Sequence, residues 1–336
     1  MITEALSQTE LEGVFERRIV PVVFSQPPSR KNPELVIVSG QPGSGTAAVA
    51  ARLQSESPSG MATVNADDLR AFHPGFLELA ASRSPDAASA LAESAAEWIR
   101  LSLAHARTNG HPIVLDGSLT SPRAVLGLAE LFKDHGFQSL VVITATPRSE
   151  SLLSSMSRFL LDARSNTRSP LVDVARHDAA LEGTRELAQA LEESGGVDRL
   201  SVVTGRGDVI FEAAEGDSLT SAREAVLRGQ SVSMSNAEAM RWLAELRAMT
   251  DLVVRAGRVS PAIGEVLLEL HDAALQDVLP RITLPQDSQA GPATVESLGR
   301  QRDALRSVMA QKAPVIREDL AAPTIAPDSS GPSIGR

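Results

Sequence analysis

The sequence predicts an α/β protein in which helices flank a parallel β-sheet, with a helical region appended at its C-terminal end. Up to about residue 230, short apolar runs bounded by Gly, Pro and Asn alternate with segments of helical periodicity. This alternation is typical of a parallel sheet with crossover helices. Beyond that point, only helical periodicity remains. The first apolar run also leads into a glycine-rich turn and an alanine-rich helix, as in a nucleotide-binding α/β domain.

The elements can be assigned in chain order. Residues 1–32 predict an amphipathic helix and a Pro- and Ser-containing linker. An α/β domain is expected over residues 33–230. Its elements are strand 34–40, helix 45–53, strand 61–66, helix 86–106, strand 112–117, helix 122–133, strand 139–145, helices 149–164 and 170–193, and strands 199–204 and 208–213.

The C-terminal part divides into two segments. Residues 231–312 contain three segments with apolar residues at three- and four-residue spacing, which predicts helices over 236–257, 260–279 and 294–311. Residues 313–336 are rich in Pro, Ser and Gly, a composition that predicts a disordered tail.

Composition excludes several classes of protein. The net charge of −10 argues against a nucleic-acid-binding protein, because phosphate backbones are bound by clustered Lys and Arg. The chain has no cysteine, so it can form neither a disulfide framework nor a thiolate metal site. Its N-terminus lacks the features of a signal peptide, and its apolar runs are too short to span a bilayer. We therefore expect a cytoplasmic protein that binds neither nucleic acid nor membrane.

A glycine-rich stretch between the first strand and its helix is the strongest functional signal. In this context a G-x-x-x-x-G pattern predicts a P-loop, whose backbone N–H groups and helix N-terminus bind phosphate. A plain strand-to-helix turn is the alternative. The predicted nucleotide-binding residues are Gly40, Gln41, Pro42, Gly43, Ser44, Gly45, Thr46 and Ala47.

The loop lacks the lysine of a complete P-loop. In one alignment Thr46 replaces that lysine and Ala47 replaces the hydroxyl residue that binds magnesium. In the other, one residue is missing and Thr46 is itself the metal-binding hydroxyl. Neither alignment restores the lysine, and neither Lys31 nor Arg52 is expected to reach the loop from its predicted position.

Several ordered motifs between residues 33 and 193 resemble the zeta toxin family. They are "GQPGSG", "NADDLRAFHPGF", "VLDGSL", "SRFL" and "TRSPLVDVARHD". Zeta toxins are P-loop kinases of bacterial toxin–antitoxin systems that phosphorylate UDP-N-acetylglucosamine at a sugar hydroxyl. The resemblance implies ATP or GTP as phosphoryl donor, Mg²⁺ as cofactor, and a small helical antitoxin as a possible partner.

The resemblance also implies catalytic residues. Asp67 matches the general base, which accepts the proton of the attacking hydroxyl. Arg158 and Arg168 match two arginines over the phosphates, where guanidinium groups neutralise developing charge. The alternatives are a helix N-cap for Asp67 and surface ion pairs for the arginines, and Arg164 competes for the same role.

Substrate-binding residues follow in the same way. Asp116 and Ser118 match positions that hold the amino sugar, while Arg70 and His73 belong to the motif around the general base. A structural role for His73 is the stronger alternative. His177 and Asp178 match a family pair for which packing or helix capping is at least as good an explanation. Thr120 stands where the family usually has an arginine, so a second cation is missing.

Three functions remain open at this stage. The first is a sugar-nucleotide kinase whose activity is impaired, because loss of one preorganised charged donor costs about 10²–10³ in rate. The second is a nucleotide- or sugar-binding pseudokinase. The third is an interaction module, in which the helical C-terminal region acts like an antitoxin in cis.

Overall fold

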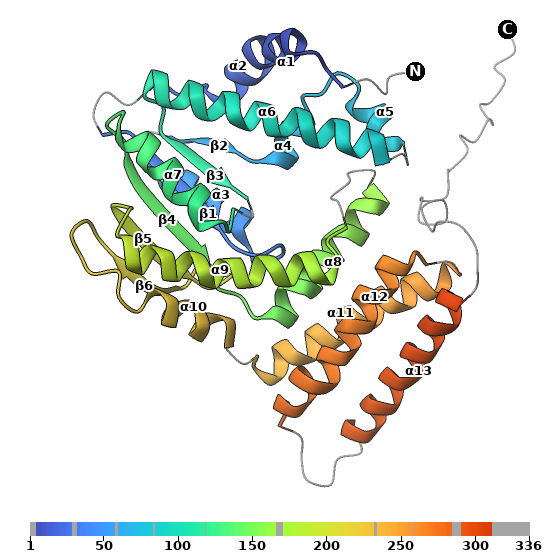
Figure 1. Cartoon of the computed structure of the whole chain (residues 1–336). Coiled ribbons are helices and arrows are strands. Elements are labelled where there is room, and N and C mark those ends of the chain that lie inside the picture. Colours follow the sequence, from blue (N-terminus) through green and yellow to red (C-terminus); the bar gives the residue numbers. More distant parts are fainter. Residues whose placement is uncertain are drawn as a thin grey trace, which may run out of the picture.

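The computed structural model describes residues 5–28, 32–57, 60–82, 85–117, 119–165, 171–231, 234–257, 259–283 and 290–310. Its centre is a six-stranded sheet with the order β2-β3-β1-β4-β5-β6 (Figure 1). The strands are β1 Glu34–Ser39, β2 Ala62–Val64, β3 Ile113–Asp116, β4 Gln138–Thr144, β5 Arg199–Val203 and β6 Val209–Ala213. All neighbouring pairs are parallel except β5 and β6, which are antiparallel. The predicted α/β fold is thus confirmed, with one antiparallel edge strand.

Both faces of the sheet are covered, which explains why its central strands are almost continuously apolar. Along β1, Leu35 and Ile37 belong to the main hydrophobic core, whereas Val36 and Val38 pack with Val49 of α3 on the other face. The helices are α3 Thr46–Glu56 on one face, and α6 Pro85–Asn109, α7 Pro122–Lys133, α9 Val174–Ser194 and α10 Ala222–Ser231, which contribute to the main core (Figure 1).

Three short helices were not expected from the sequence. They are α4 Ala66–Arg70, α5 Phe76–Ala81 and α10. The predicted strand over 61–66 is too long, because Asn65 is the N-cap of α4 and its side chain accepts a hydrogen bond from the Asp68 amide at 2.8 Å. The helix predicted from residue 170 begins at Val174, after the N-cap Asp173, and residue 170 lies outside the described part. In both places capping side chains set the helix start, which hydrophobic periodicity does not reveal.

The N-terminal segment belongs to the main core. It consists of α1 Gln8–Val14, the π-helical turn Phe15–Ile19 and α2 Val20–Val23. Its apolar residues pack against α6, where the indole of Trp98 donates a hydrogen bond to the Leu11 carbonyl at 3.0 Å. The segment expected to precede the α/β domain is therefore built into it.

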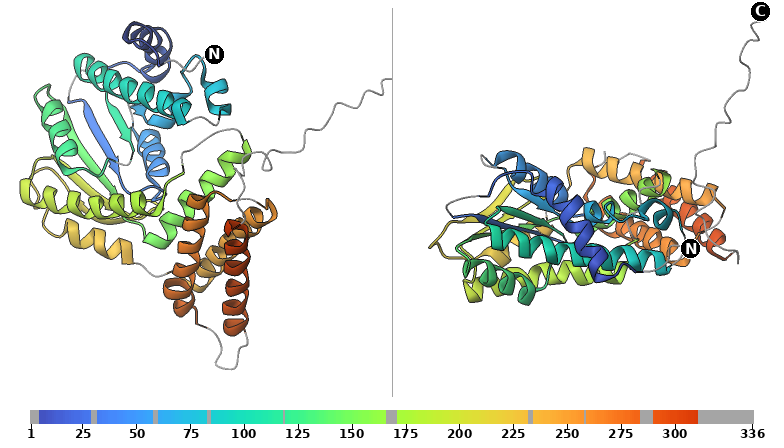
Figure 2. Two further views of the ribbon diagram at one scale, coloured as in Figure 1. Left: turned by 45° about the vertical axis from the view of Figure 1, so that its right-hand side comes forward. Right: turned by 90° about the horizontal axis from the view of Figure 1, so that it is seen from above.

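The C-terminal helices form a second lobe on the long helix α8, Arg148–Ser165 (Figure 2). Its elements are α11 Asn236–Arg255, α12 Pro261–Ala273, the helical turns Ala274–Val278 and Leu279–Arg281, and α13 Ala290–Ala310. Leu152, Met156 and Phe159 of α8 belong to the core of this lobe, and Trp242 of α11 donates a hydrogen bond to the Ser149 carbonyl at 3.0 Å. The tail predicted to be disordered, 313–336, lies outside the described residues. None of the described helices is long and apolar enough to cross a membrane.

Candidate functional site

The predicted phosphate-binding loop joins β1 to α3 at the carboxyl edge of the sheet. Gly43 and Gly45 have φ angles of +79° and +98°, a region that side chains disfavour. A Cβ on Gly43 would collide with the Ser151 carbonyl, and one on Gly45 would collide with the Gly205 backbone. Both positions thus need glycine for conformation and for space.

Buried polar contacts fix the shape of the loop. The Gln41 side-chain amide donates to the Thr146 carbonyl at 2.7 Å, and Ser44 shares a hydrogen bond of 2.6 Å with the Thr144 hydroxyl. The Thr146 hydroxyl in turn donates to the Ser44 carbonyl at 2.8 Å. No side chain caps α3, so the N-terminus of this helix is available to an anion.

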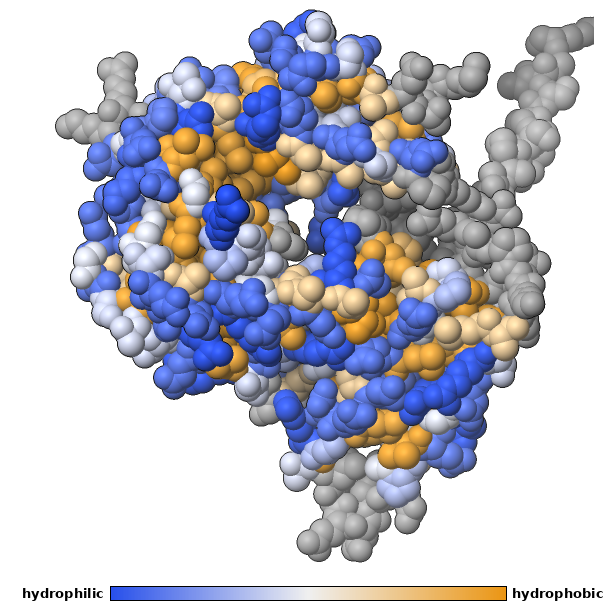
Figure 3. Space-filling model, viewed as in Figure 1, coloured by the Kyte–Doolittle hydropathy of each residue, from blue (hydrophilic) through white to orange (hydrophobic). Residues whose placement is uncertain are grey.

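A cavity of about 1060 Å³ opens in front of the loop and α3. In Figure 3 the molecule is visibly hollowed between α6 and α9. The loop contributes Gly43 and Thr46 to its wall, and the N-terminal segment contributes Val22 and Gln26. Its charged lining residues are Asp67, Asp68, Asp116, Arg70, Arg158 and Arg176. Three carboxylates thus face three guanidinium groups.

Asp67 sits within this cavity between two arginines. One carboxylate oxygen is 2.8 Å from Arg70, and the other is 3.4 Å from Arg158. The N-cap alternative for Asp67 is wrong, because Asn65 caps α4. Asp68 interacts with that cap instead, accepting a hydrogen bond from the Asn65 amide at 2.6 Å.

Asp116 ends β3 beside the first residue of α3. Burial raises the pKa of its carboxyl group, and Asp67 and Asp68 add to this, while a hydrogen bond from Thr46 and the charge of Arg158 oppose it. Its Oδ1 atom is buried and has no hydrogen-bond partner among the described residues. Carboxylate and hydroxyl oxygens are ligands that Mg²⁺ accepts, so Asp116 and Thr46 fit a magnesium ion. The sugar-binding role expected for Asp116 stays a prediction.

The remaining predicted substrate and catalytic residues divide into two groups. His73 does not line the cavity: it is buried beside Trp98, and its Nδ1 accepts a hydrogen bond from the Gly75 amide at 3.1 Å. This placement favours the structural role for His73. Ser118, Arg168 and the side chain of Arg164 lie outside the described residues.

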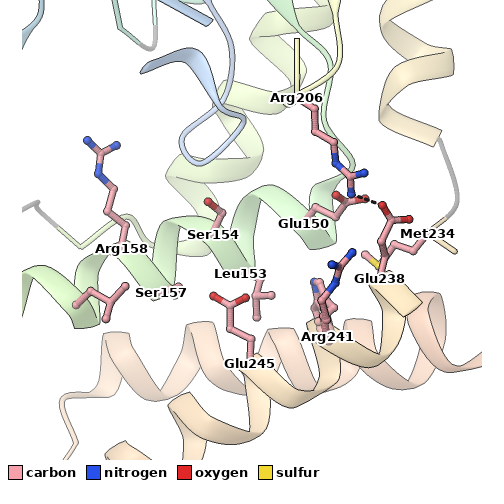
Figure 4. Close-up of a pocket in the computed structure, with 12 residues that line it drawn as sticks. Glu150, Leu153, Ser154, Ser157, Arg158, Arg206, Met234, Glu238, Arg241 and Glu245 are labelled. Carbon is pink, nitrogen blue, oxygen red and sulfur yellow. Dashed lines mark hydrogen bonds and ion pairs between the residues drawn. The ribbon is translucent and has the colours of Figure 1, made fainter. Parts of the chain in front are cut away.

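A second cavity, of about 550 Å³, lies between α8 and α11 (Figure 4). Arg158 lines both cavities and stands at one end of this one, while Arg206 and Glu238 form an ion pair at the other. Glu245 extends from α11 toward α8. Burial raises the pKa of Glu150 here, opposed by the charge of Arg206.

His177 and Asp178 lie behind the loop rather than in either cavity. His177 is fully buried, with its Nε2 atom 3.0 Å from the Ser151 hydroxyl and its Nδ1 atom 3.2 Å from Asp178. A serine hydroxyl that contacts a histidine, which in turn contacts an aspartate, is the arrangement of a nucleophilic triad. Ser151 has no exposed surface, however, so no substrate can reach its hydroxyl group.

The zeta toxin family model matches residues 22–215, more than half of the chain. The chain belongs to the zeta toxin family. It is 23% identical to Toxin PezT of Streptococcus pneumoniae over 131 residues, which cover 39% of this chain and 52% of that protein. It is 19% identical to Toxin zeta of Enterococcus hirae over 191 residues, 56% of this chain and 67% of that one. The chain thus spans about half the length of Toxin PezT.

A solved structure shares the fold. The structure described as the PezAT chromosomal toxin–antitoxin system of Streptococcus pneumoniae has a TM-score of 0.62 and 17% identity. The likeness covers 75% of this chain and all of that one. The family expected from the motifs is therefore confirmed.

The zeta toxin match is longer than the motifs indicated. It starts at residue 22 rather than near residue 33, and so includes the end of the N-terminal segment that lines the cavity. Arg176, which our sequence analysis did not single out, also lines the cavity. It lies inside the quoted motif "TRSPLVDVARHD", one residue before His177, and this position was the only signal that could have drawn attention to it.

The described residues that line the cavity in front of the phosphate-binding loop include no lysine that could replace the missing one. Arg52 was expected not to reach the loop, and it instead pairs with Glu56 at 3.0 Å and donates to the Gly207 carbonyl at 2.9 Å. Lys31 lies outside the described residues. The hydroxyl of Thr46 lies close enough to Asp116 to favour its ionised form, which agrees with the alignment in which Thr46 is the metal-binding hydroxyl.

Proposed function

We propose that this chain is a kinase that transfers the γ-phosphate of ATP or GTP to a sugar hydroxyl of UDP-N-acetylglucosamine. The observation that carries the proposal is the position of Asp67, which shares one cavity with a rigid glycine loop and is held by Arg70 and Arg158. Membership of the zeta toxin family supports the reaction, and the acceptor is the one that the resemblance implies.

The charges of the cavity support a requirement for a divalent cation. Three carboxylates offset three guanidinium groups there, so the protein alone provides no excess of positive charge for a triphosphate. Thr46 and Asp116 would hold Mg²⁺, and the ion would neutralise part of the phosphate charge. The buried, unpartnered oxygen of Asp116 is the feature that fits this role.

The proposed reaction needs one proton acceptor and one cation near the transferred group. The sugar oxygen forms a bond to the γ-phosphorus, the bond from that phosphorus to the β-γ bridging oxygen breaks, and a nucleoside diphosphate leaves. Asp67 takes the proton of the sugar hydroxyl. Arg158, which lies 3.4 Å from Asp67, is placed to stabilise negative charge on the phosphoryl oxygens.

Product analysis tests the proposal. The purified chain is incubated with Mg²⁺, ATP or GTP, and UDP-N-acetylglucosamine, and phosphorylated product is measured by mass spectrometry. We expect Asp67→Asn to lower the rate about 10²–10⁴-fold, as for loss of a general base. Asp68→Asn is the matched control, because this neighbour interacts with the cap of α4 instead. Absence of product from both the unmodified chain and Thr46→Lys would exclude the kinase.

A nucleotide-binding protein without turnover is the second candidate. The observation that favours it is Thr46, a neutral residue where a kinase of this kind needs a cation. In that case calorimetry would show Mg²⁺-dependent binding of a non-hydrolysable ATP analogue, whereas product would form only in Thr46→Lys. Product from the unmodified chain would rule this candidate out.

A helical antitoxin is the protein partner that we propose. The support is family membership and the fold shared with a protein of the PezAT toxin–antitoxin system. The alternative is that the C-terminal lobe itself acts as an antitoxin in cis. The observation behind it is that α11 forms one wall of the second cavity, beside Arg158. Growth of cells that express the chain with and without residues 231–336 separates the two, since only antitoxin action in cis predicts greater toxicity after the deletion.

A further inference from the structure

A continuous series of polar contacts leads away from the phosphate-binding loop. It begins at Gln41 in the loop, whose side-chain amide donates to the Ser151 hydroxyl at 3.2 Å. The Ser151 oxygen lies 3.0 Å from Nε2 of His177. All three residues are almost fully buried, so water cannot readily replace these contacts.

The series ends in the C-terminal lobe. His177 contacts Asp178 at 3.2 Å, and Arg148 donates two hydrogen bonds to the Asp178 carboxylate at 2.7 and 2.8 Å. The third nitrogen of the same guanidinium, Nη1, lies 2.8 Å from the Glu269 carboxylate on α12. Arg148 is the first residue of α8, Asp178 lies on α9 and Glu269 lies on α12. The Arg148 side chain therefore joins the two lobes.

The direction of each hydrogen bond follows from chemistry. An ionised carboxylate only accepts, so His177 carries its proton on Nδ1 and donates it to Asp178. Its Nε2 atom is then an acceptor for the Ser151 hydroxyl, which also lies within hydrogen-bond distance of the Pro147 and Arg148 carbonyls at 3.1 and 3.2 Å. The Gln41 amide group that donates to the Thr146 carbonyl at 2.7 Å also donates to Ser151, so both contacts favour the same orientation of Gln41.

Two electrostatic effects support this arrangement. Burial lowers the pKa of His177, which keeps the imidazole neutral at neutral pH despite the hydrogen bond to Asp178. Burial alone would raise the pKa of Asp178, but hydrogen bonds from Arg148 and His177 outweigh it and keep the carboxyl group ionised. The Ser151 hydroxyl, one of the two acceptors of the Gln41 amide, is thus linked to Arg148 through His177 and Asp178.

We propose that Glu269 is a positioning residue for the phosphate-binding loop, acting through Arg148, Asp178, His177 and Ser151 on Gln41. The C-terminal lobe thereby takes part in shaping the nucleotide site. Without Glu269 the Arg148 guanidinium keeps its two hydrogen bonds to Asp178 but loses its contact with the C-terminal lobe, so the positions of Arg148 and Asp178 are less restrained. The effect on nucleotide affinity rests on the function proposed above, whereas the effect on loop geometry does not.

Nuclear magnetic resonance spectroscopy of the full chain tests the geometric part. Glu269→Gln is compared with Glu265→Gln, which makes the same charge change at an exposed position of α12 outside the series. We expect the side-chain amide signals of Gln41 and the backbone amide signals of Gly43 and Gly45 to move only in Glu269→Gln. Loop signals that coincide in the two variants would overturn the proposal.

Nucleotide binding tests its consequence. We expect Glu269→Gln to weaken binding of a non-hydrolysable ATP analogue about two- to fivefold, as befits a partly exposed ion pair. Arg148→Lys keeps the charge but loses the paired hydrogen bonds to Asp178, so we expect a loss of about tenfold. Equal unfolding temperatures of the two glutamate variants would show that the effect is not a loss of fold.

The outcomes of the two measurements are separable. If the loop signals move and the unmodified chain binds no nucleotide, the proposed function fails and the positioning role of Glu269 stands. If the unmodified chain binds nucleotide and Glu269→Gln binds it equally well, the role in shaping the nucleotide site is overturned.

Discussion

Position 46 carries the largest chemical departure from a complete phosphate-binding loop. Thr46 opens α3, lines the cavity and lies beside Asp116, so its hydroxyl suits a metal ion but provides no positive charge to a phosphate. The cations that line the cavity among the described residues are arginines, and two of them, Arg70 and Arg158, are paired with Asp67. For the proposed kinase, this arrangement predicts weak activity.

Restoring the lysine is expected to increase turnover. Thr46→Lys adds a charge that can approach the terminal phosphates but removes the hydroxyl proposed to bind Mg²⁺. With Mg²⁺ in excess to offset that lost ligand, the gain in kcat should be about 10²–10³, the usual value of one preorganised charged donor. Thr46→Gln, which adds length without charge, is the control. Initial rates of product formation at saturating nucleotide measure both. An equal gain in the two variants would mean that length rather than charge limits the site.

Asp116 gives a prediction about stability and pH. Because its pKa is raised in the folded state, the native protein binds a proton more tightly than the unfolded chain, so this group makes folding less favourable as pH rises above its unfolded pKa of 3.8. Asp116→Asn should therefore raise the unfolding temperature of the ligand-free protein at pH 7. The gain should vanish below pH 3.8, which thermal unfolding at several pH values can show. A lower unfolding temperature at pH 7 would contradict this account.

At the residue level, the sequence motifs correctly brought several residues together in space, but their roles stay predictions. Asp67, Asp116, Arg70 and Arg158 all line one cavity, as expected of site residues. His73 belongs to the same motif but turns into the core, because motif membership does not reveal which way a side chain points. Ser118 and Arg168 lie outside the described residues, so for them even the location stays a prediction.

The element that organises both lobes is α8. One face of this helix supplies apolar residues to the C-terminal core, while the backbone of Ser151 and Ser155 approaches Gly43 of the loop. The loop is thus pressed against a helix that the C-terminal lobe also holds. Because the C-terminal lobe holds α8 in place, the helix backbone cannot move away to make room for a side chain at Gly43.

Gly43→Ala is expected to disturb the loop. The new Cβ would meet the Ser151 carbonyl and would sit at a positive φ angle, which costs of order 1–3 kcal/mol. Gly127→Ala on α7 is the matched control, because a Cβ there has open space and alanine favours a helix. Urea unfolding should show a loss of stability in the first variant and a gain of about 0.5–1 kcal/mol in the second. Equal stability of Gly43→Ala and the unmodified chain would contradict the packing account.

Element prediction from sequence was limited by length. The long helices and the central strands were predicted because their apolar patterns extend over several turns or residues. Helices α4 and α5 contain only five and six residues, too few for a periodic pattern, and they occupy the segment between β2 and α6. The antiparallel direction of β6 follows from its short connection to β5, because residues 204–208 are too few for a crossover between parallel strands.

At the scale of the whole molecule, the protein has two main hydrophobic cores, and α8 supplies apolar residues to the second of them. The boundaries expected at residues 32 and 230 follow changes in composition. The structure shows that the N-terminal segment completes the first core. It also shows that α8 is shared between the lobes, because its apolar residues belong to the second core while Ser151 contacts the phosphate-binding loop. Composition does not reveal this sharing, because it depends on which face of a helix meets which lobe.

Buried histidines should make stability depend on pH. Burial lowers the pKa of His271 to about 4, helped by the charge of Arg302. The unfolded chain takes up this proton near pH 6.5 and the native protein does not, so the stabilisation is complete above pH 6.5 and is lost as pH falls toward 4. At pH 5 the loss from His271 alone is about 2 kcal/mol.

Urea unfolding at pH 7 and pH 5 measures this effect. His271→Gln should show a smaller difference in unfolding free energy between the two pH values than the unmodified chain. His135→Gln, at an exposed site after α7, is the control and should keep the full difference. If His271→Gln retained the same pH dependence, the loss of stability would have to come from other groups.

The two tryptophans of the chain each donate a hydrogen bond across a junction between segments. Trp98 on α6 bonds to the N-terminal helix, and Trp242 on α11 bonds to the start of α8. Both indole rings are buried, so each should emit at short wavelength only while its own junction is closed. The protein thus carries a native fluorophore at each of these two joints. Trp98→Phe and Trp242→Phe would each leave one of them, so that the opening of the N-terminal helix and of the C-terminal lobe can be followed separately in real time without any added label.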